Sequence, residues 1–267
     1  MNKFSLFNFN VQFFNVGGWV LTVLRYFTKR RLFSCVKRNK DLLVKNRNET
    51  CYICALGPSL KQVDLSKIQG DTIAVNRFYK IGKEYPDFTP TYYLLIDALF
   101  KKPENRQDFL EAMSQYRGKK TTYLVHSKFY GEKELIRDDD NVYYLSCFKG
   151  QFNHNKKFRI DRVMPSFGNV ASTAIAVAIS LGYKKIVLLG CDFNSFASTT
   201  RNHCYADKST DRAYRMSFEL FAYSFYAYLH DELQKYAVAN GVEIINSTKG
   251  SLIDAYPVRI DESLYKS

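Results

Sequence analysis

Seven short apolar runs, each followed by a turn or a helix-like segment, constrain the fold of this 267-residue chain most strongly. Runs of this length, rich in β-branched and aromatic residues, are typical of buried strands. They are TCYICAL, DTIAVN, PTYYLLID, TTYLVH, NVYYLSC, KKIVLLGCD and VEIINS. Strands that alternate with helices predict a Rossmann-like α/β fold: a mostly parallel sheet with helices on both faces.

The segments between these runs predict the helices. A helix is expected to start at SLKQVDLSKI after the first run, another covers 101–116, and an alanine-rich helix stops at Gly182. In 208–239, Phe and Tyr recur at helical spacing, which favours a long core helix. No internal repeat or linker divides residues 49–267, so they are predicted to form one domain.

Residues 1–48 form a separate basic extension, because they carry +9 of the net charge of +13. Within it, GGWVLTVLRYFTKRRLF combines apolar and basic residues at roughly helical spacing, as in amphipathic helices that lie on anionic membranes. The alternatives are a helix packed on the domain and a solvated tail. No nucleic-acid-binding module accompanies the charge, so a nucleic-acid partner is not favoured. We expect a cytoplasmic protein, peripheral on the inner membrane.

Six cysteines are scattered along the chain, and Cys51 and Cys54 form a C-x-x-C sequence inside a predicted strand. Strand alternation directs these two side chains to opposite faces, so they would make a poor metal pair. We expect reduced, buried thiols, in keeping with the cytoplasm, and no metal site.

Polar residues follow the predicted strands at the end where α/β sheets bind ligands. We therefore expect them to converge on one crevice. They are Gly57, Pro58 and Ser59 after the first strand, Asn76 after the second, Asp97 after the third, Asp192 and Asn194 after KKIVLLG, and Asn246, Ser247 and Thr248 after the last.

The Gly-Pro-Ser turn has a physical rationale as a phosphate site. Gly57 permits a tight turn and a close backbone approach, and Pro58 fits the first turn of a helix. A helix starting there would direct its N–H groups at a phosphate. The structural alternative is that such turns commonly join strands to helices without binding anything.

Several segments resemble known families. CALGPSLKQVD, IAVNRFYK and AIAVAISLGYKKIVLLGCDF resemble the bacterial sialyltransferases of glycosyltransferase family 42. With YYLLID, GNVASTA and VEIINSTKGSLIDAYP, they are even more similar to the 6-hydroxymethylpterin diphosphokinase-like family, over roughly residues 50–258. The resemblance implies a GT-A-like variant of the fold. It also implies inverting transfer of a sugar from a CMP-activated donor to a glycan acceptor, in the synthesis of a bacterial surface polysaccharide or lipooligosaccharide.

The resemblance also implies roles for individual residues. His203 matches the family's general base, and histidine, with an ordinary pKa near 6.5, suits that role at neutral pH. Asn202 and Tyr205 are candidates to contact the leaving phosphate, because Phe193 and Phe196 stand where the family has tyrosines. Leu56 replaces an asparagine before the turn. The implied nucleotide and donor contacts are Gly57, Pro58, Ser59, Asn76, Asp97, Ser166, Gly168, Asn169, Asp192 and Asn194.

Two other functions stay open. Asp97 and Asp192 could hold Mg²⁺ on a nucleoside triphosphate in a diphosphokinase, although no G-x-x-x-x-G-K-[ST] loop is present. A non-catalytic membrane-surface scaffold would bind no nucleotide. The transferase itself is expected to need no cofactor besides its donor. Of the other histidines, His230 lies in the aromatic segment and is predicted to be structural.

Overall fold

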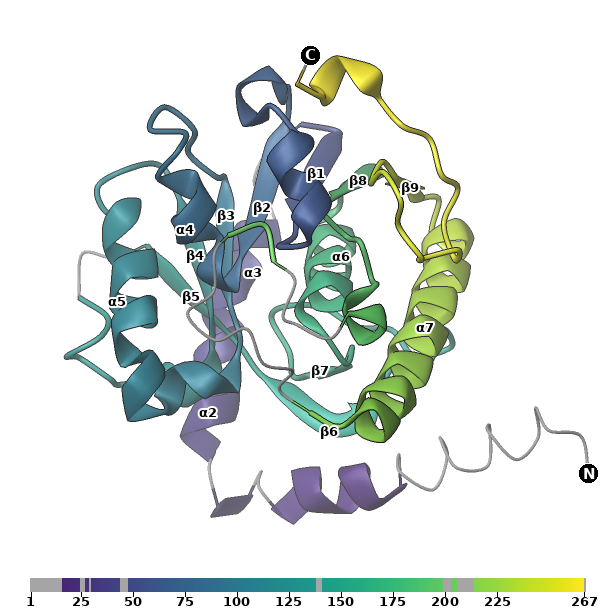
Figure 1. The fold of residues 1–267 in the computed structure, drawn as a ribbon. Helices are drawn as coiled ribbons and strands as arrows, with labels where there is room; N and C mark the ends of the chain where they lie inside the picture. Colours follow the sequence, from purple (N-terminus) through teal and green to yellow (C-terminus); the bar gives the residue numbers. More distant parts are fainter. Residues whose placement is uncertain are drawn as a thin grey trace, which may run out of the picture.

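The computed structural model describes residues 16–24, 27–28, 30–43, 48–137, 141–198, 203–205 and 214–266. Seven parallel strands form the central sheet, in the order β5-β4-β3-β2-β1-β8-β9 (Figure 1). The strands are β1 Thr50–Cys54, β2 Asp71–Val75, β3 Tyr92–Leu95, β4 Thr122–His126, β5 Val142–Leu145, β8 Lys185–Leu189 and β9 Glu243–Asn246. Each predicted run supplies one of these strands, which confirms the Rossmann-like α/β prediction.

The order of the sheet reverses at β1. The chain passes from β1 through β2, β3 and β4 to β5 on one side, and β8 and β9 pair on the other side. Beyond the last register pair of β1 and β8, Ala55 N–H donates to Leu189 O (2.9 Å) and Gly57 N–H to Gly190 O (2.8 Å). Where the strand order reverses, the connections diverge and leave a crevice at the carboxyl edge.

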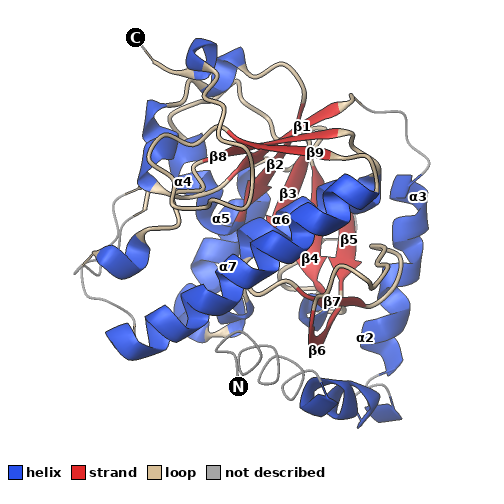
Figure 2. Cartoon of the chain, turned by 90° about the vertical axis from the view of Figure 1, so that its right-hand side faces the viewer, coloured by secondary structure: helices blue, strands red, loops and turns tan. Residues whose placement is uncertain are grey.

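Helices cover both faces of the sheet (Figure 2). One face packs against α6, α7 and Leu42 of α3, and the other against α4 and α5. After the N-terminal helix 16–24, the α-helices of the described residues include α2 Arg30–Ser34, α3 Lys40–Leu43, α4 Tyr79–Gly82, α5 Arg106–Gln115, α6 Val170–Leu181 and α7 Met216–Ala239. Cys51 lies in the first of these two cores and Cys54 in the second, as strand alternation predicted.

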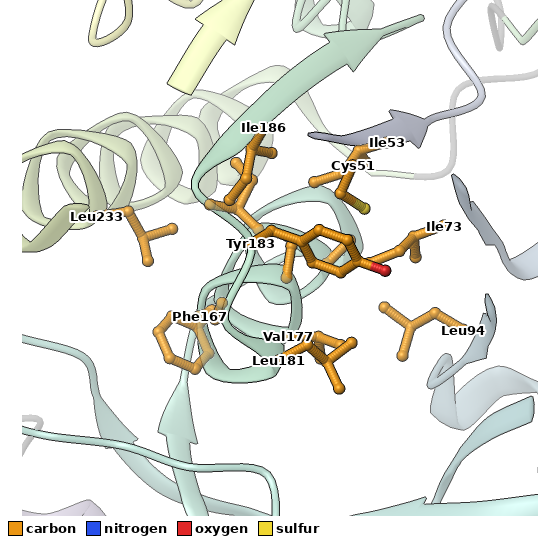
Figure 3. Packing of buried hydrophobic residues seen from close by; sticks show 14 of the residues in the cluster. Cys51, Ile53, Ile73, Leu94, Phe167, Val177, Leu181, Tyr183, Ile186 and Leu233 are labelled. Carbon is orange, nitrogen blue, oxygen red and sulfur yellow. The ribbon is translucent and has the colours of Figure 1, made fainter. Parts of the chain in front are cut away.

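Helix α6 lies in the centre of the larger core because small and β-branched residues cover nearly all of its surface. Val177 and Leu181 pack toward Tyr183 and strand residues such as Ile186 (Figure 3). The Tyr183 hydroxyl donates to Asp71 Oδ2 (2.6 Å). The helix ends at Gly182, whose φ of 95° is the left-handed conformation that glycine adopts readily.

The prediction of a helix at SLKQVDLSKI is wrong, because this segment forms two short 3-10 helices, Pro58–Gln62 and Leu65–Lys67. Val63, between them, is extended. The predicted helix at 101–116 starts as an α-helix only at Arg106. Pro103 has no N–H and restricts the residue before it, so the segment preceding Arg106 consists of 3-10 turns.

Two strands were not predicted. β6 Cys147–Gln151 and β7 Met164–Ser166 form a separate two-stranded sheet. β7 has three residues, one of them Pro165, so it is too short for a period of two to be read. The aromatic helix is described from Met216, and the preceding part of the predicted segment, 208–213, lies outside the described residues.

The N-terminal extension has two structural parts. Its first helix, 16–24, is largely exposed, whereas Val36 and Leu42 are fully buried. Asn39 Nδ2 donates to Tyr144 O and Ile160 O, both at 2.7 Å. Residues 35–43 therefore pack into the domain. None of the helices in the described part of the chain combines the length and hydrophobicity needed to span a bilayer.

Candidate functional site

Two adjoining cavities open at the carboxyl edge of the sheet. The smaller, of about 310 Å³, lies between the ends of β1 and β8, and the larger, of about 670 Å³, lies at the ends of β2, β3 and β4. Asn169, Val170 and Tyr226 line both. Predicted residues that line the smaller cavity are Gly57, Pro58, Asn169, Asp192, Asn194 and His203. Those that line the larger are Asn76, Asp97, Ser166, Gly168 and Asn169.

Two of the residues implied by the resemblance, Ser59 and Tyr205, line neither cavity. Ser59 is buried behind the smaller cavity, where it contacts Asp192. Tyr205 lines neither cavity but stacks on His203. Asn202 lies outside the described residues.

Gly57 is required for close packing rather than for an unusual backbone angle. Its φ and ψ of −68° and 157° are accessible to any residue. A Cβ at this position would, however, lie 1.9 Å from Asp192 Oδ2 and 2.6 Å from Gly190 O. The two loops therefore meet without room for a side chain.

Asp192 is fixed by the Gly-Pro-Ser turn. Its carboxylate, 7% exposed, accepts the Ser59 hydroxyl at Oδ2 (2.7 Å) and the Ser59 N–H at Oδ1 (3.1 Å). Burial raises the pKa of Asp192, although the Ser59 hydrogen bonds act in the opposite direction. The turn begins a five-residue 3-10 helix instead of an α-helix, and a carboxylate already accepts its N–H. The expected α-helix N-terminus is therefore absent from this turn.

The helix N-terminus that borders both cavities belongs to α6. Val170 lines both, and Asn169 caps the helix by accepting the Ser172 N–H at Oδ1 (2.8 Å). Within the described chain, the Asn169 Nδ2 group has no hydrogen-bond partner. The first N–H groups of a twelve-residue helix favour an anion. An Asn before the alanine-rich run is an N-cap signal that the sequence offered.

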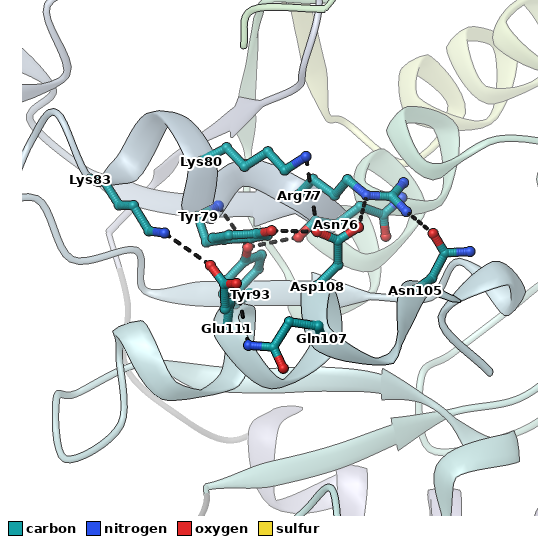
Figure 4. A network of polar contacts seen from close by, with 10 residues as sticks. All are labelled: Asn76, Arg77, Tyr79, Lys80, Lys83, Tyr93, Asn105, Gln107, Asp108 and Glu111. Atoms are coloured by element: carbon teal, nitrogen blue, oxygen red, sulfur yellow. Dashed lines mark hydrogen bonds and ion pairs between the residues drawn. The ribbon is translucent and has the colours of Figure 1, made fainter. Parts of the chain in front are cut away.

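Asn76 is held in a strained conformation at the end of β2. Its φ is 43°, and within the described chain its Oδ1 atom is buried without a hydrogen-bond partner. The Tyr93 hydroxyl donates to Asn76 O (2.7 Å) and accepts from Tyr79 N–H (2.9 Å), which fixes this backbone (Figure 4). Strain and an unsatisfied polar atom at a cavity wall are typical of binding sites.

An ionic network connects the residues after β2 to Asp108 of α5. Arg77 Nε contacts Asp108 Oδ2 (2.6 Å), and Tyr79 donates to Asp108 Oδ1 (2.5 Å), as Figure 4 shows. Burial alone would raise the pKa of Asp108, but the hydrogen bonds from Tyr79 and Arg77 lower it. The carboxylate therefore stays charged and keeps Arg77 and Tyr79 in place beside Asn76.

The larger cavity also contains polar groups that the sequence did not single out. His126 ends β4, and Lys128 follows it; the Lys128 N–H donates to His126 Nδ1 (3.1 Å). The strand-end rule applied to TTYLVH would have found His126. At the end of β3, Asp97 caps the 3-10 helix Ala98–Lys101 by accepting the Leu99 N–H (2.9 Å). Gly168 has a φ of 78°, and a Cβ there would lie 2.7 Å from Tyr226 Cδ1.

His203 borders the smaller cavity from an exposed position. Its ring lies 5.1 Å from that of Tyr205, at an interplanar angle of 22°. The adjacent Cys204 is buried, and its N–H donates to Leu56 O (2.8 Å). This anchor connects the histidine to the loop after β1.

Aromatic rings form the opposite wall of the smaller cavity. Phe193, with a φ of 58°, lies 4.7 Å from the Tyr223 ring and 5.5 Å from His230. His230 is 1% exposed and contacts Tyr256 Oη through Nδ1 (2.9 Å) and Ser172 Oγ through Nε2 (3.3 Å). Sequence reasoning had given this histidine a structural role, and it lines the cavity as well.

Protonation of His230 should destabilise the fold. Burial lowers its pKa from 6.5 to about 4, so the unfolded chain binds the proton first as pH falls. The stabilising contribution is complete above pH 6.5 and is lost toward pH 4, by about 3 kcal/mol for such a shift. Urea unfolding at pH 7 and pH 4.5 should show a smaller loss for His230→Gln than for the parent. An equal loss in both proteins would contradict this.

Asn246, which ends β9, and the next two residues, Ser247 and Thr248, do not line either cavity, contrary to the expectation that they converge with the other strand ends. Asn246, Ser247 and Thr248 are fully buried. Asn246 Nδ2 donates to Ser251 Oγ (2.8 Å), and Thr248 Oγ1 accepts the Cys191 N–H (3.1 Å). They therefore fix the loop behind Asp192.

Among the described residues, no three His, Cys, Asp or Glu side chains lie together in an arrangement that could hold a metal ion. Asp97 and Asp192 line different cavities.

Solved sialyltransferases from Campylobacter jejuni share this fold. The sialyltransferase CstII in complex with cytidine-5'-monophosphate is 16% identical, with a TM-score of 0.51 over 84% of this chain and 89% of that one. The monofunctional alpha-2,3-sialyltransferase Cst-I is 15% identical, with a TM-score of 0.46 over 84% of each chain. No curated protein sequence matches.

The sequence itself matches one family model. Residues 28–196, more than half of the chain, fit the model described as 6-hydroxymethylpterin diphosphokinase MptE-like. The match includes the first eight strands, α6, and both loops that meet at Gly57. The chain therefore belongs to the 6-hydroxymethylpterin diphosphokinase MptE-like family.

Proposed function

We propose that this protein is an inverting glycosyltransferase that uses a CMP-activated sugar. The observation that carries the proposal is the pair of cavities at the carboxyl edge, joined at the N-terminus of α6. One is lined by aromatic rings and the other by polar side chains. The fold shared with CstII, a sialyltransferase solved with cytidine-5'-monophosphate, supports the choice of nucleotide.

The two cavities suit the two halves of such a donor. Phe193 and Tyr223 offer aromatic surfaces for a nucleotide base in the smaller cavity. The N-terminus of α6 lies where the cavities meet, and it would hold the phosphate between base and sugar. In the larger cavity, Asn76 and Lys128 supply polar contacts for the sugar.

Transfer requires the acceptor hydroxyl to lose its proton as its oxygen bonds to the anomeric carbon. The bond between that carbon and the phosphate oxygen breaks on the opposite side, and CMP leaves with the electron pair. His203, at the margin of the smaller cavity, would accept the proton. The N–H groups of α6 would stabilise the charge on the phosphate. Inversion at the anomeric carbon follows from a single displacement.

Family membership supports a second candidate, Mg²⁺-dependent diphosphoryl transfer. In this reaction Asp97 and Asp192 would have to share the ion. Both carboxylates already accept hydrogen bonds, Asp97 from Leu99 N–H and Asp192 from Ser59, and they line separate cavities. This arrangement favours the glycosyltransferase. A scaffold without catalytic activity is the third candidate.

Titration calorimetry on the full chain separates these functions. We expect CMP to bind without added metal. We expect a CMP-activated sugar to bind at least about tenfold more weakly to Asn76→Ala than to the parent, because the Asn76 side chain supplies a buried unsatisfied acceptor in the cavity assigned to the sugar. Tighter binding of ATP with Mg²⁺ than of CMP would support the diphosphokinase instead. Binding of neither nucleotide would support the scaffold.

A further inference from the structure

Exposed large apolar side chains gather at two places on this molecule. Isolated examples elsewhere include Val238 and Val258. Helix 16–24 and the start of α7 both lie in the lower half of Figures 1 and 2. The two groups are Val16, Trp19, Val20, Leu21, Leu24 and Phe27, and Tyr214, Met216, Phe218, Leu220 and Phe221. Clusters of this kind mark an interaction surface.

The exposure extends around each helix instead of following one stripe. Successive helical residues are rotated by about 100°, so Met216 and Leu220, four residues apart, share one side of α7, whereas Phe218 points to the opposite side. All three are more than 40% exposed, and so are the consecutive residues Trp19, Val20 and Leu21. A folded protein partner would cover one face of such a helix, whereas the fluid headgroup region of a bilayer accommodates apolar side chains on more than one side.

Positive charge accompanies the first helix. Residues 1–48 carry +9, and the cations that follow helix 16–24 include the exposed residues Arg30, Lys37, Arg38 and Lys40. Basic residues next to an apolar helix are attracted by the negative surface of anionic bilayers. The positive charge therefore favours an anionic bilayer over an uncharged partner as the occupant of this surface.

We propose that helix 16–24, with residues 27–28, and the start of α7 together bind the surface of an anionic lipid bilayer. The apolar side chains enter the headgroup region, and the basic residues contact the anionic headgroups. The two elements touch the bilayer at separate points, which sets the orientation of the domain on it.

This orientation has a consequence for the acceptor, which rests on the proposed function. Helix α7 also supplies Tyr223 and Tyr226 to the cavity walls, one to two turns after Phe218 and Phe221. If the start of α7 enters the bilayer, the cavities lie close to the lipid surface. An acceptor glycan anchored in the same membrane then reaches them.

The single tryptophan of the chain, Trp19, is 63% exposed and reports directly on this surface. Vesicles of phosphatidylcholine with phosphatidylglycerol should shift its emission to shorter wavelength, and brominated lipid should quench it. Binding to pure phosphatidylcholine should be roughly tenfold weaker or worse. We expect L24E/F27E to weaken vesicle binding at least about tenfold, and F218E/F221E to weaken it several-fold. The matched control V238E changes another exposed apolar residue of α7 and should bind as the parent does.

Unchanged emission at saturating lipid, or unchanged binding of both double variants, would overturn the proposal. If F218E/F221E changes the elution volume of the lipid-free protein from that of a dimer to that of a monomer, a second copy covers α7, and its role in lipid binding is rejected. Vesicle binding needs no nucleotide. Loss of CMP binding with lipid binding retained would therefore contradict the proposed function alone.

Discussion

Replacing His203 by glutamine is expected to lower kcat for sugar transfer by roughly 10²–10⁴. His203 is the one predicted catalytic residue, and it borders the smaller cavity on a segment anchored through Cys204 N–H to Leu56 O (2.8 Å). Glutamine retains polar atoms of similar reach but does not accept a proton at neutral pH. Because the histidine acts on the acceptor, the affinity for CMP should change little.

His154→Gln provides a matched control for this variant. His154 bonds to Glu232 through Nδ1 (2.6 Å) and lines neither cavity, so transfer should continue at the parental rate. Initial rates with a CMP-activated sugar, and calorimetry with CMP, measure the two effects. Turnover of His203→Gln equal to that of the parent would remove His203 from the mechanism. Loss of CMP affinity in proportion to turnover would assign it to binding instead.

Gly57→Ala should have the largest effect on the site as a whole. The added Cβ would overlap Asp192 Oδ2 at 1.9 Å and Gly190 O at 2.6 Å. The second contact is with backbone, so the loops after β1 and β8 must separate. We expect a loss of about 3 kcal/mol in the free energy of unfolding, typical of severe overpacking. The Ser59–Asp192 hydrogen bonds (2.7 and 3.1 Å) should break with it, and CMP binding should fall below detection.

Urea unfolding and CMP calorimetry measure these two changes. Gly17→Ala is the control, since a Cβ at Gly17 meets no atom within 4 Å. Its stability and CMP affinity should match those of the parent. Parental stability in Gly57→Ala would mean that the loops at the reversal of the sheet are not packed as described.

The sheet could be predicted because each of its strands is a compact apolar run. Burial on both faces makes the strands continuous in hydrophobicity, and the intervening helices require parallel pairing. The long connection after β5 contains no comparable apolar run. Its strands, β6 and β7, are a five-residue segment containing Gly150 and a three-residue segment containing Pro165, so composition alone does not distinguish them from a loop.

The candidate site was predicted in outline, but the element that presents a helix N-terminus to it was not. Strand ends indicated Asn76, Asp97 and Asp192, and all three line cavities at the carboxyl edge. The Gly-Pro-Ser turn suggested an α-helix N-terminus, but Asp192, 133 residues away in sequence, accepts from Ser59 there. Such a long-range contact leaves no local sequence signal. The N-terminus at the cavities belongs to α6, whose cap, Asn169, local reasoning could have identified.

The glycines illustrate a similar limit. A glycine at position 57 suggested a special backbone conformation, yet its φ is −68°, and the reason for it is the approach of Gly190 and Asp192. Conversely, Phe193 has a positive φ of 58°, which its residue type does not indicate, and Asn76 has a φ of 43°, which asparagine adopts more readily than most non-glycine residues. One hydrogen bond, from the Tyr93 hydroxyl to Asn76 O, holds Asn76, and packing against Tyr223 holds Phe193. Tertiary contacts set these angles, so sequence patterns did not predict them.

The central claim is that strand ends distant in sequence form one nucleotide site at the carboxyl edge. A crystal structure of the protein soaked with CMP measures it most directly. We predict density for the base beside Phe193 and Tyr223, with the phosphate at the N-terminus of α6. Density for CMP at the amino edge of the sheet, or crystals that stay empty at saturating CMP, would contradict it.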